Sequence, residues 1–262
     1  MTPDWIEVNG VSLRYELAGA GPATLVLVHE LGGCLDSWEE TLPAFGRHFR
    51  TLRYDQRGFG HSEKVRGTIA LDDMVIDLAS MLDRLGIAGP VHLAGSALGA
   101  GIAAAFAARH PARMGKLVLQ SLVTQTDPQW RQTMEVRAAT VERDGLRPQA
   151  QASLDRSYPA IVRGNRERFE RYRQRWIAND PLSFAAINRM LLGMDLAVEL
   201  PGIACPTLSI GCEHDVLRPP AMVREVTALI PGARYVDADS GHFMAVQTPD
   251  LFTDLVIPFL LA

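Results

Sequence analysis

The segment Gly95-Ser96-Ala97-Leu98-Gly99 has the spacing of a sharp turn that presents a nucleophile between a strand and a helix. Such a turn brings the residues two before and two after its apex into contact, so both must be glycine. With Ala97 at the apex, Gly95 and Gly99 fill these positions. With Ser96 at the apex, Leu98 would occupy a crowded position that it does not fit. The apex is therefore a methyl group, and Ser96 is expected to form a local hydrogen bond beside the turn.

A candidate acid and a candidate base follow this turn in the chain. Asp215 lies in the loop after a predicted strand, where a carboxylate can hold an imidazole in one tautomer and stabilise its charged form. Glu213 and His214 are the neighbouring alternatives, but the spacing past the strand favours Asp215. His242 follows Gly241 just past the last predicted strand, and it is the candidate base. The order apex, acid, base is that of a hydrolytic triad whose nucleophile is missing.

The loop His29-Glu30-Leu31-Gly32-Gly33 follows the third predicted strand. In a site of this kind, that loop and the residue after the apex each supply a backbone N–H to a developing oxyanion. This assigns the two donors to Leu31 and Leu98, whose N–H groups do not depend on the side chain at the apex. The Glu30 carboxylate is a second base, a ligand for a cationic substrate group, or a group tied to neighbouring backbone N–H groups. Glu30 and Ser96 are the predicted substrate contacts.

Alternating strands and helices must position these residues. Eight short segments are predicted to be strands, and Asn9-Gly10 between the first two is a hairpin signal. The alternation predicts an α/β fold with a mostly parallel eight-stranded sheet flanked by helices. The predicted strands are residues 6–8, 11–16, 23–29, 49–54, 91–94, 116–122, 206–210 and 233–236, and the predicted helices outside the central segment are 71–85, 100–109, 221–229 and 251–261.

The alternation stops between residues 124 and 200, where the pattern is helical throughout, including residues 165–176. We therefore expect a core formed by residues 1–123 and 201–262 and a helical cap formed by residues 124–200. Eleven arginines lie between Arg131 and Arg175, against six acids. They form either a basic lid that attracts an anionic substrate or solvated helix faces that cover apolar surface. The second interpretation is favoured for most of them, and cap aromatics such as Tyr172 and Trp176 are expected mainly to pack.

Together with the loop, the turn and Gly241-His242, the segment Tyr54-Asp55-Gln56-Arg57-Gly58-Phe59-Gly60-His61-Ser62 resembles the α/β-hydrolase superfamily over essentially the whole chain. Within it, the chain resembles the 3-oxoadipate enol-lactonase branch, small bacterial enzymes with a helical cap. The resemblance implies the α/β-hydrolase fold. The Asp55 segment is specific to the superfamily and not to a substrate, so Asp55 and Arg57 are interpreted as structural.

The chain departs from the family at Ala97, where typical members carry a serine that forms an acyl-enzyme. The aminoacrylate hydrolases of pyrimidine breakdown are similar in carrying Gly-x-Ala-Leu-Gly at this turn. The leading hypothesis is a hydrolase of a small ester, enol-lactone or other activated carbonyl compound, in which His242 and Asp215 activate water. Three alternatives remain open: a serine esterase or lactonase disarmed by an engineered change at position 97, a non-hydrolytic His/Asp lyase or cofactor-free oxygenase, and a non-catalytic protein that binds a small molecule.

Composition narrows the class of protein. The 262 residues are 47% hydrophobic and 21% charged, which fits one globular domain with an insertion. The net charge of −4 and the pI near 6.0 lack the excess of positive charge that is typical of proteins that bind nucleic acid. Three cysteines at unrelated spacings, one of them Cys34 beside the Glu30 loop, are interpreted as reduced thiols, and Cys34 is not expected to be a nucleophile. No cofactor, metal or membrane partner is expected, the location is expected to be cytoplasmic, and a homo-oligomer is left open.

Overall fold

The computed structural model describes residues 2–122, 124 and 128–262, and in these residues it contains one eight-stranded sheet. The strand order is β1-β2-β4-β3-β5-β6-β7-β8. The pairs β1–β2 and β2–β4 are antiparallel, and all other neighbours are parallel. The strands are β1 (Asp4–Val8), β2 (Val11–Ala18), β3 (Ala23–Val28), β4 (Phe49–Tyr54), β5 (Val91–Ser96), β6 (Met114–Gln120), β7 (Thr207–Cys212) and β8 (Arg234–Ala238).

Helices cover both faces of this sheet, which explains why β3 is a nearly continuous apolar run. Alternate residues of β3 belong to two separate clusters of buried side chains: Val26 and Val28 to one, Leu25 and Leu27 to the other. The first cluster includes α2 (Leu71–Arg84) and α3 (Leu98–Arg109), and the second includes α1 (Leu42–Phe45), α9 (Met244–Gln247) and α10 (Pro249–Leu261). The predicted α/β-hydrolase architecture is therefore confirmed.

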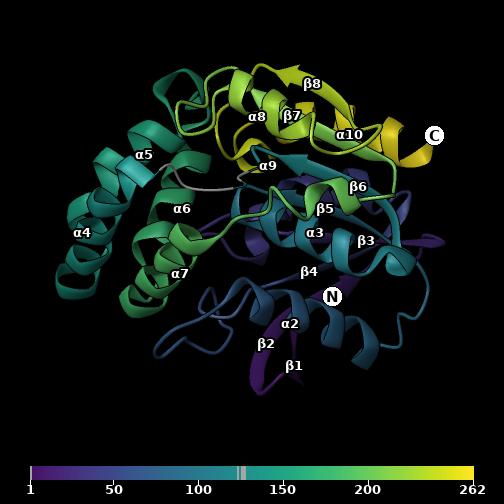
Figure 1. The fold of residues 1–262 in the computed structure, drawn as a ribbon, viewed down its shortest axis with the longest axis horizontal. Helices are drawn as coiled ribbons and strands as arrows, with labels where there is room; N and C mark the ends of the chain where they lie inside the picture. The colour runs from purple at the N-terminus through teal and green to yellow at the C-terminus, as the bar shows by residue number, and fades with distance from the viewer. Residues whose placement is uncertain (1, 123, 125–127) are drawn as a thin grey trace.

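The segment between β6 and β7 is helical in the residues described. Its α-helices are α4 (Pro128–Asp144), α5 (Ala150–Ser157), α6 (Arg166–Ile177) and α7 (Pro181–Gly193). They lie together to one side of the sheet (Figure 1), while α8 (Pro220–Thr227) rejoins the core after β7. The predicted boundary between core and cap falls where only residue 124 of 123–127 is described, so the domain boundaries stay predictions. We refer to α4 to α7 as the cap.

Several elements differ from the sequence-based expectations. The helix α3 begins directly after Ala97, two residues earlier than predicted, and the strand β6 ends at Gln120 instead of Leu122. The short helices η1 (Leu35–Thr41), α1 and α9 were not predicted, because four to seven residues are too few for a periodic pattern to stand out.

In the part of the chain that the structure describes, no helix is long and apolar enough to cross a membrane.

Candidate active site

The turn between β5 and α3 has the strained geometry of a nucleophile elbow. Ala97 has φ 49° and ψ −108°, a conformation that non-glycine residues rarely adopt. A side chain at Gly95 would place its Cβ 2.3 Å from the carbonyl oxygen of Gly99. At Gly99, a Cβ would lie 2.0 Å from the carbonyl oxygen of Val28. Both glycines are therefore required by contact, and the strained residue at the apex is Ala97.

The same close approach brings the start of α3 against the end of β3. Leu98 is the first residue of α3, where a backbone N–H has no acceptor within its own helix. The carbonyl oxygen of His29, one residue before the Glu30 loop, lies 2.6 Å from a Cβ built at Gly99. The N-terminal turn of α3 therefore adjoins the loop that contains Leu31. The assignment of the Leu31 and Leu98 N–H groups to an oxyanion hole stays a prediction.

Asp215 and His242 form a hydrogen-bonded pair at the carboxyl ends of neighbouring strands β7 and β8. His242 Nδ1 lies 2.7 Å from Asp215 Oδ2, and the two residues are only 8% and 2% exposed. Oδ2 also accepts a hydrogen bond from Ser121 Oγ at 2.8 Å, and Oδ1 accepts the Leu217 and Arg218 N–H groups at 2.9 Å. Burial raises the pKa of Asp215, but His242 and these hydrogen bonds outweigh it and leave that pKa lowered. The carboxylate is therefore charged, and the imidazole donates from Nδ1, which leaves Nε2 as the basic nitrogen.

Ser96 lies beside the elbow, fully buried at 2% exposure. Its hydroxyl donates to Gln120 Oε1 at 2.5 Å, the local hydrogen bond that the sequence predicts. This engagement turns the hydroxyl to a partner inside the protein, and the predicted contact of Ser96 with substrate stays an untested expectation. Gln120 was not among the predicted site residues, although a polar residue at the end of an otherwise apolar strand is a signal that could have found it.

Glu30 is buried, with its side chain folded over the loop that follows it. Its Oε1 accepts a hydrogen bond from Ser37 Oγ at 2.8 Å, and a Cβ at Gly33 would lie 2.4 Å from the same oxygen. The hydroxyl of Tyr172 on α6 is also buried. Burial raises the pKa of Tyr172 well above its ordinary value, and the negative charge of Glu30 raises it further, so the two groups are close. This buried carboxylate thus faces a buried hydroxyl.

Tyr172 connects this carboxylate to the base through ring contacts. The ring centroids of Tyr172 and Phe243 lie 5.4 Å apart, and those of Phe243 and His242 lie 4.8 Å apart. The ring of Tyr172 packs against its neighbours, as predicted, but the sequence did not predict that its hydroxyl lies close to Glu30. Sequence patterns cannot show this, because the contact joins the cap to a loop more than 140 residues earlier in the chain.

His29, after β3, and Asp55, after β4, form hydrogen bonds that hold the surrounding loops. His29 Nε2 accepts the Gln56 N–H at 3.0 Å while Nδ1 donates to the Glu30 carbonyl oxygen at 2.8 Å, and burial lowers the pKa of His29. Asp55 accepts the N–H groups of Leu35 at 2.7 Å and His61 at 2.8 Å. These hydrogen bonds fix the loops beside the site.

Arg57 and Cys34 also have roles outside the chemistry. Arg57 Nε lies 2.5 Å from the Asp77 carboxylate, so this arginine ties its loop to α2. Burial, more than nearby carboxylates, raises the pKa of Cys34 to about 12. The thiol is protonated near neutral pH and is a poor nucleophile.

The three cysteines are free, as predicted.

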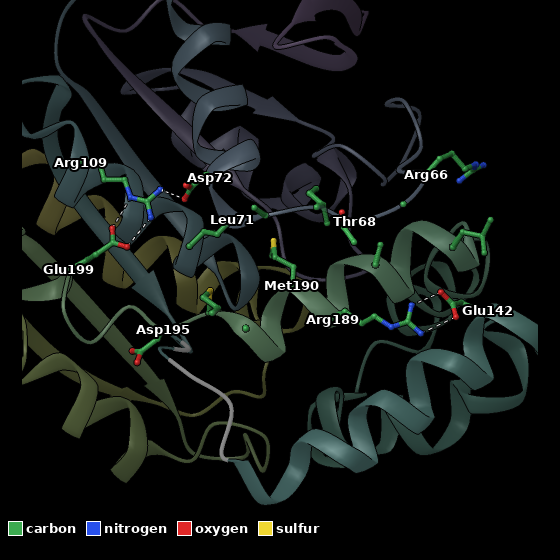
Figure 2. A pocket seen from close by; sticks show the side chains of 17 residues that line it. Arg66, Thr68, Leu71, Asp72, Arg109, Glu142, Arg189, Met190, Asp195 and Glu199 are labelled. Atoms are coloured by element: carbon green, nitrogen blue, oxygen red, sulfur yellow. Dashed lines mark hydrogen bonds and ion pairs between the residues drawn. The ribbon is translucent and has the colours of Figure 1, made fainter.

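A cavity of about 760 Å³ opens where α7 meets the loop before α2 (Figure 2). Its floor includes Leu71 and Met190, and none of the predicted site residues lines it. Its arginines are paired with acids, as Arg109 is with Glu199 at 2.7 Å. The lining contains no histidine, and the His242–Asp215 pair lies outside it. Among the residues that the structure describes, no group of three or more histidines, cysteines and acids could hold a metal ion.

Several cap arginines are also paired with acids. Arg163 binds Asp155, Arg168 and Arg171 bind Glu40, and Arg189 binds Glu135 and Glu142. Arg137 instead donates hydrogen bonds to Gln149 and Ser153. The pairing agrees with the interpretation of a solvated helix surface, and attraction of an anionic substrate stays a prediction.

Comparison with known proteins supports a hydrolytic role. A family model described as alpha/beta hydrolase fold matches residues 23–148. The putative carbamate hydrolase RutD of Pantoea ananatis is 30% identical over 256 residues, covering 95% of this chain and 93% of the relative. The crystal structure of the enol-lactonase from Burkholderia xenovorans LB400 is 31% identical with a TM-score of 0.92, covering 99% of this chain and 100% of that one. The esterase from Thermogutta terrifontis, with malate bound, is 25% identical with a TM-score of 0.92, covering 100% and 98%.

Proposed function

The chain belongs to the α/β-hydrolase fold family, and from this premise we propose that it hydrolyses a small activated carbonyl compound with water as its nucleophile. The hydrogen-bonded His242–Asp215 pair, together with an elbow that has alanine at its apex, carries this proposal. His242 removes a proton from water, and Asp215 stabilises the imidazolium that forms. The Leu31 and Leu98 N–H groups stabilise the oxyanion.

Three observations support this assignment of roles. The strained backbone at Ala97 is the conformation that presents an apex side chain, and a methyl group leaves room where a hydroxyl would otherwise lie. The Nδ1 atom of His242 is occupied by the acid, so Nε2 is the nitrogen that can accept a proton. Positioning and oxyanion donors without a nucleophile can still accelerate hydrolysis on the order of 10³-fold over water. This suits an ester, an enol-lactone or a carbamate, and it does not suit a stable amide.

Restoring the missing hydroxyl distinguishes this mechanism from a disarmed serine hydrolase. Ala97→Ser is expected to change kcat/KM by less than roughly 10-fold in either direction, because the site is organised around water. The measurement is the hydrolysis rate of p-nitrophenyl acetate and of an enol-lactone by both forms. A gain of about 10⁴-fold or more with a burst of p-nitrophenol would instead support an engineered change at position 97.

We also propose that Glu30 binds a positively charged or N–H-bearing group of the substrate. It is a buried carboxylate that faces the buried Tyr172 hydroxyl, and such a pair can accept and orient a donor. Glu30→Gln keeps the shape but removes the charge. We expect kcat/KM to fall about 10-fold for an amino-bearing ester and to stay within about twofold for its uncharged analogue. Glu39→Gln, on the exposed part of η1, is the control. Equal losses for both esters would contradict a binding role.

A panel of substrates tests the reaction class itself. We expect turnover of p-nitrophenyl esters, enol-lactones or carbamates, with one oxygen atom from water entering the acid product and a proton going to the leaving group. Ligand binding without turnover would support a non-catalytic binding protein. Exchange of a substrate proton with solvent, without incorporation of water, would support a lyase or an oxygenase that uses the same His/Asp pair.

A further inference from the structure

Gln120 and Ser121 lie at the carboxyl end of β6, between the strands that lead to the elbow and to the acid. Both side chains are completely buried, at 0% exposure. The strand β6 pairs with β5 on one side and with β7 on the other. Buried polar side chains need hydrogen-bond partners, and those of these two residues come from the loops of the candidate active site.

Gln120 is bonded to the elbow through both its backbone and its side chain. Its carbonyl oxygen accepts the Ala97 N–H at 2.9 Å, at the strained apex itself. Its Oε1 accepts the Ser96 hydroxyl at 2.5 Å. The other end of the same carboxamide, Nε2, donates to the carbonyl oxygen of His242 at 3.2 Å. One side chain thus joins the apex of the elbow to the backbone of the base.

Ser121 continues this network to the acid. It accepts a hydrogen bond from Gln120 Nε2 and donates from Oγ to Asp215 Oδ2 at 2.8 Å. That oxygen is the one bonded to His242 Nδ1 at 2.7 Å, so the serine hydroxyl and the imidazole share one carboxylate oxygen. The Ser121 N–H donates to the Ile210 carbonyl oxygen at 3.0 Å, which anchors the turn to β7.

The backbone of Ser121 is held in an unfavourable conformation to make this contact. Its φ is 51°, and Ala97 and Asn9 are the other non-glycine residues with positive φ among those described. Such conformations persist where the surrounding structure fixes them, and they cluster at functional sites. Two of the three strained residues are thus next to Gln120 or bonded to it.

We propose that Gln120 and Ser121 are positioning residues that hold the elbow, the acid and the base in register, and that the Ser121 hydroxyl tunes the Asp215–His242 hydrogen bond. The catalytic part of this proposal rests on the proposed function. The Ser121 hydroxyl draws electron density from the oxygen that His242 also uses. Without it, the carboxylate binds the imidazole more strongly, and the protonated, inactive form of the base persists to higher pH. Among the residues that the structure describes, the titratable groups of Arg218 and Cys212 also interact with Asp215, and the change leaves both in place.

Two variants distinguish the effect of losing the Ser121 hydroxyl from the effect of relieving the strain in its backbone. Ser121→Ala removes the hydroxyl and keeps a side chain at positive φ, whereas Ser121→Gly removes the hydroxyl and relieves the strain. In both, we expect kcat to fall about 10-fold with KM within about twofold. We also expect the acid limb of the kcat/KM profile to move to higher pH. Ser209→Ala is the matched control, because this buried serine bonds to Thr227 outside the site.

A measurement without substrate keeps this test independent of the proposed reaction. The downfield proton NMR resonance of His242 Nδ1–H, assigned by its loss in His242→Ala, is expected to move further downfield in both Ser121 variants. It is expected to keep its position in Ser209→Ala. If both Ser121 variants keep the parent resonance and the parent pH profile, the proposal is overturned. A shifted resonance in a protein that turns over no tested substrate would uphold the positioning role and contradict the proposed function alone.

Discussion

Replacing His242 by alanine is expected to lower kcat/KM by on the order of 10³-fold. The imidazole is the only group that we assign to remove a proton from water, and Ala97 offers no nucleophile to replace it. The residual activity comes from backbone N–H groups and from positioning of the substrate. The measurement is the steady-state rate with p-nitrophenyl acetate, corrected for hydrolysis in buffer.

His214→Ala is the matched control for this change. His214 also contacts a carboxylate, Asp239, at 2.7 Å, but it is partly exposed and lies outside the network of Asp215. We expect this variant to retain activity within about twofold of the parent. If His242→Ala retains more than about a tenth of the parent activity while it stays folded, His242 is not the base.

The second large effect is expected at Asp215. In Asp215→Asn, the amide oxygen can still accept the Leu217 and Arg218 N–H groups, so the loop keeps its shape. The amide nitrogen then donates to Nδ1 of His242, which places the ring proton on Nε2. That tautomer cannot accept a proton from water, and we expect kcat to fall about 10³- to 10⁴-fold with little change in KM. Stopped-time assays at high enzyme concentration measure this loss, and a loss of less than about 10-fold would contradict the assigned role.

The same carboxylate links stability to pH. The pKa of Asp215 is lower in the folded protein than its ordinary value, because His242 and the hydrogen bonds outweigh burial. Its contribution to stability is therefore present above the ordinary pKa of about 4 and is lost as pH falls through the lowered value. Asp215→Asn removes this contribution, so its melting temperature should depend less on pH in the acidic range than that of the parent.

The sequence allowed much of the fold to be predicted, because its signals are local. The apolar run of β3 and the glycine spacing around Ala97 each report on a backbone that neighbouring residues constrain. The order of the elbow, Asp215 and His242 could be read for the same reason, since each follows a recognisable strand. The short helix α9, directly after His242, has no such signal.

The rest of the site depends on contacts between distant segments. The contact of Glu30 with Tyr172 joins the loop after β3 to the cap, and no sequence pattern near either residue predicts it. Gln120 and Ser121 were included in a predicted strand, although their polar side chains interrupt its apolar pattern. Their partners, Ser96 and Asp215, are 24 and 94 residues away in the chain. Three-dimensional structure was needed to show that these residues share one network.

A single turnover in ¹⁸O-labelled water tests the central claim, attack by water without a covalent intermediate, most directly. Enzyme in excess over substrate is quenched at successive times, and mass spectrometry follows both the acid product and the intact protein. We predict that the acid formed in the first turnover carries one ¹⁸O atom and that the protein never gains the mass of the acyl group. An acyl adduct on any peptide at early times, lost as product appears, would contradict the mechanism and identify a nucleophile on the protein.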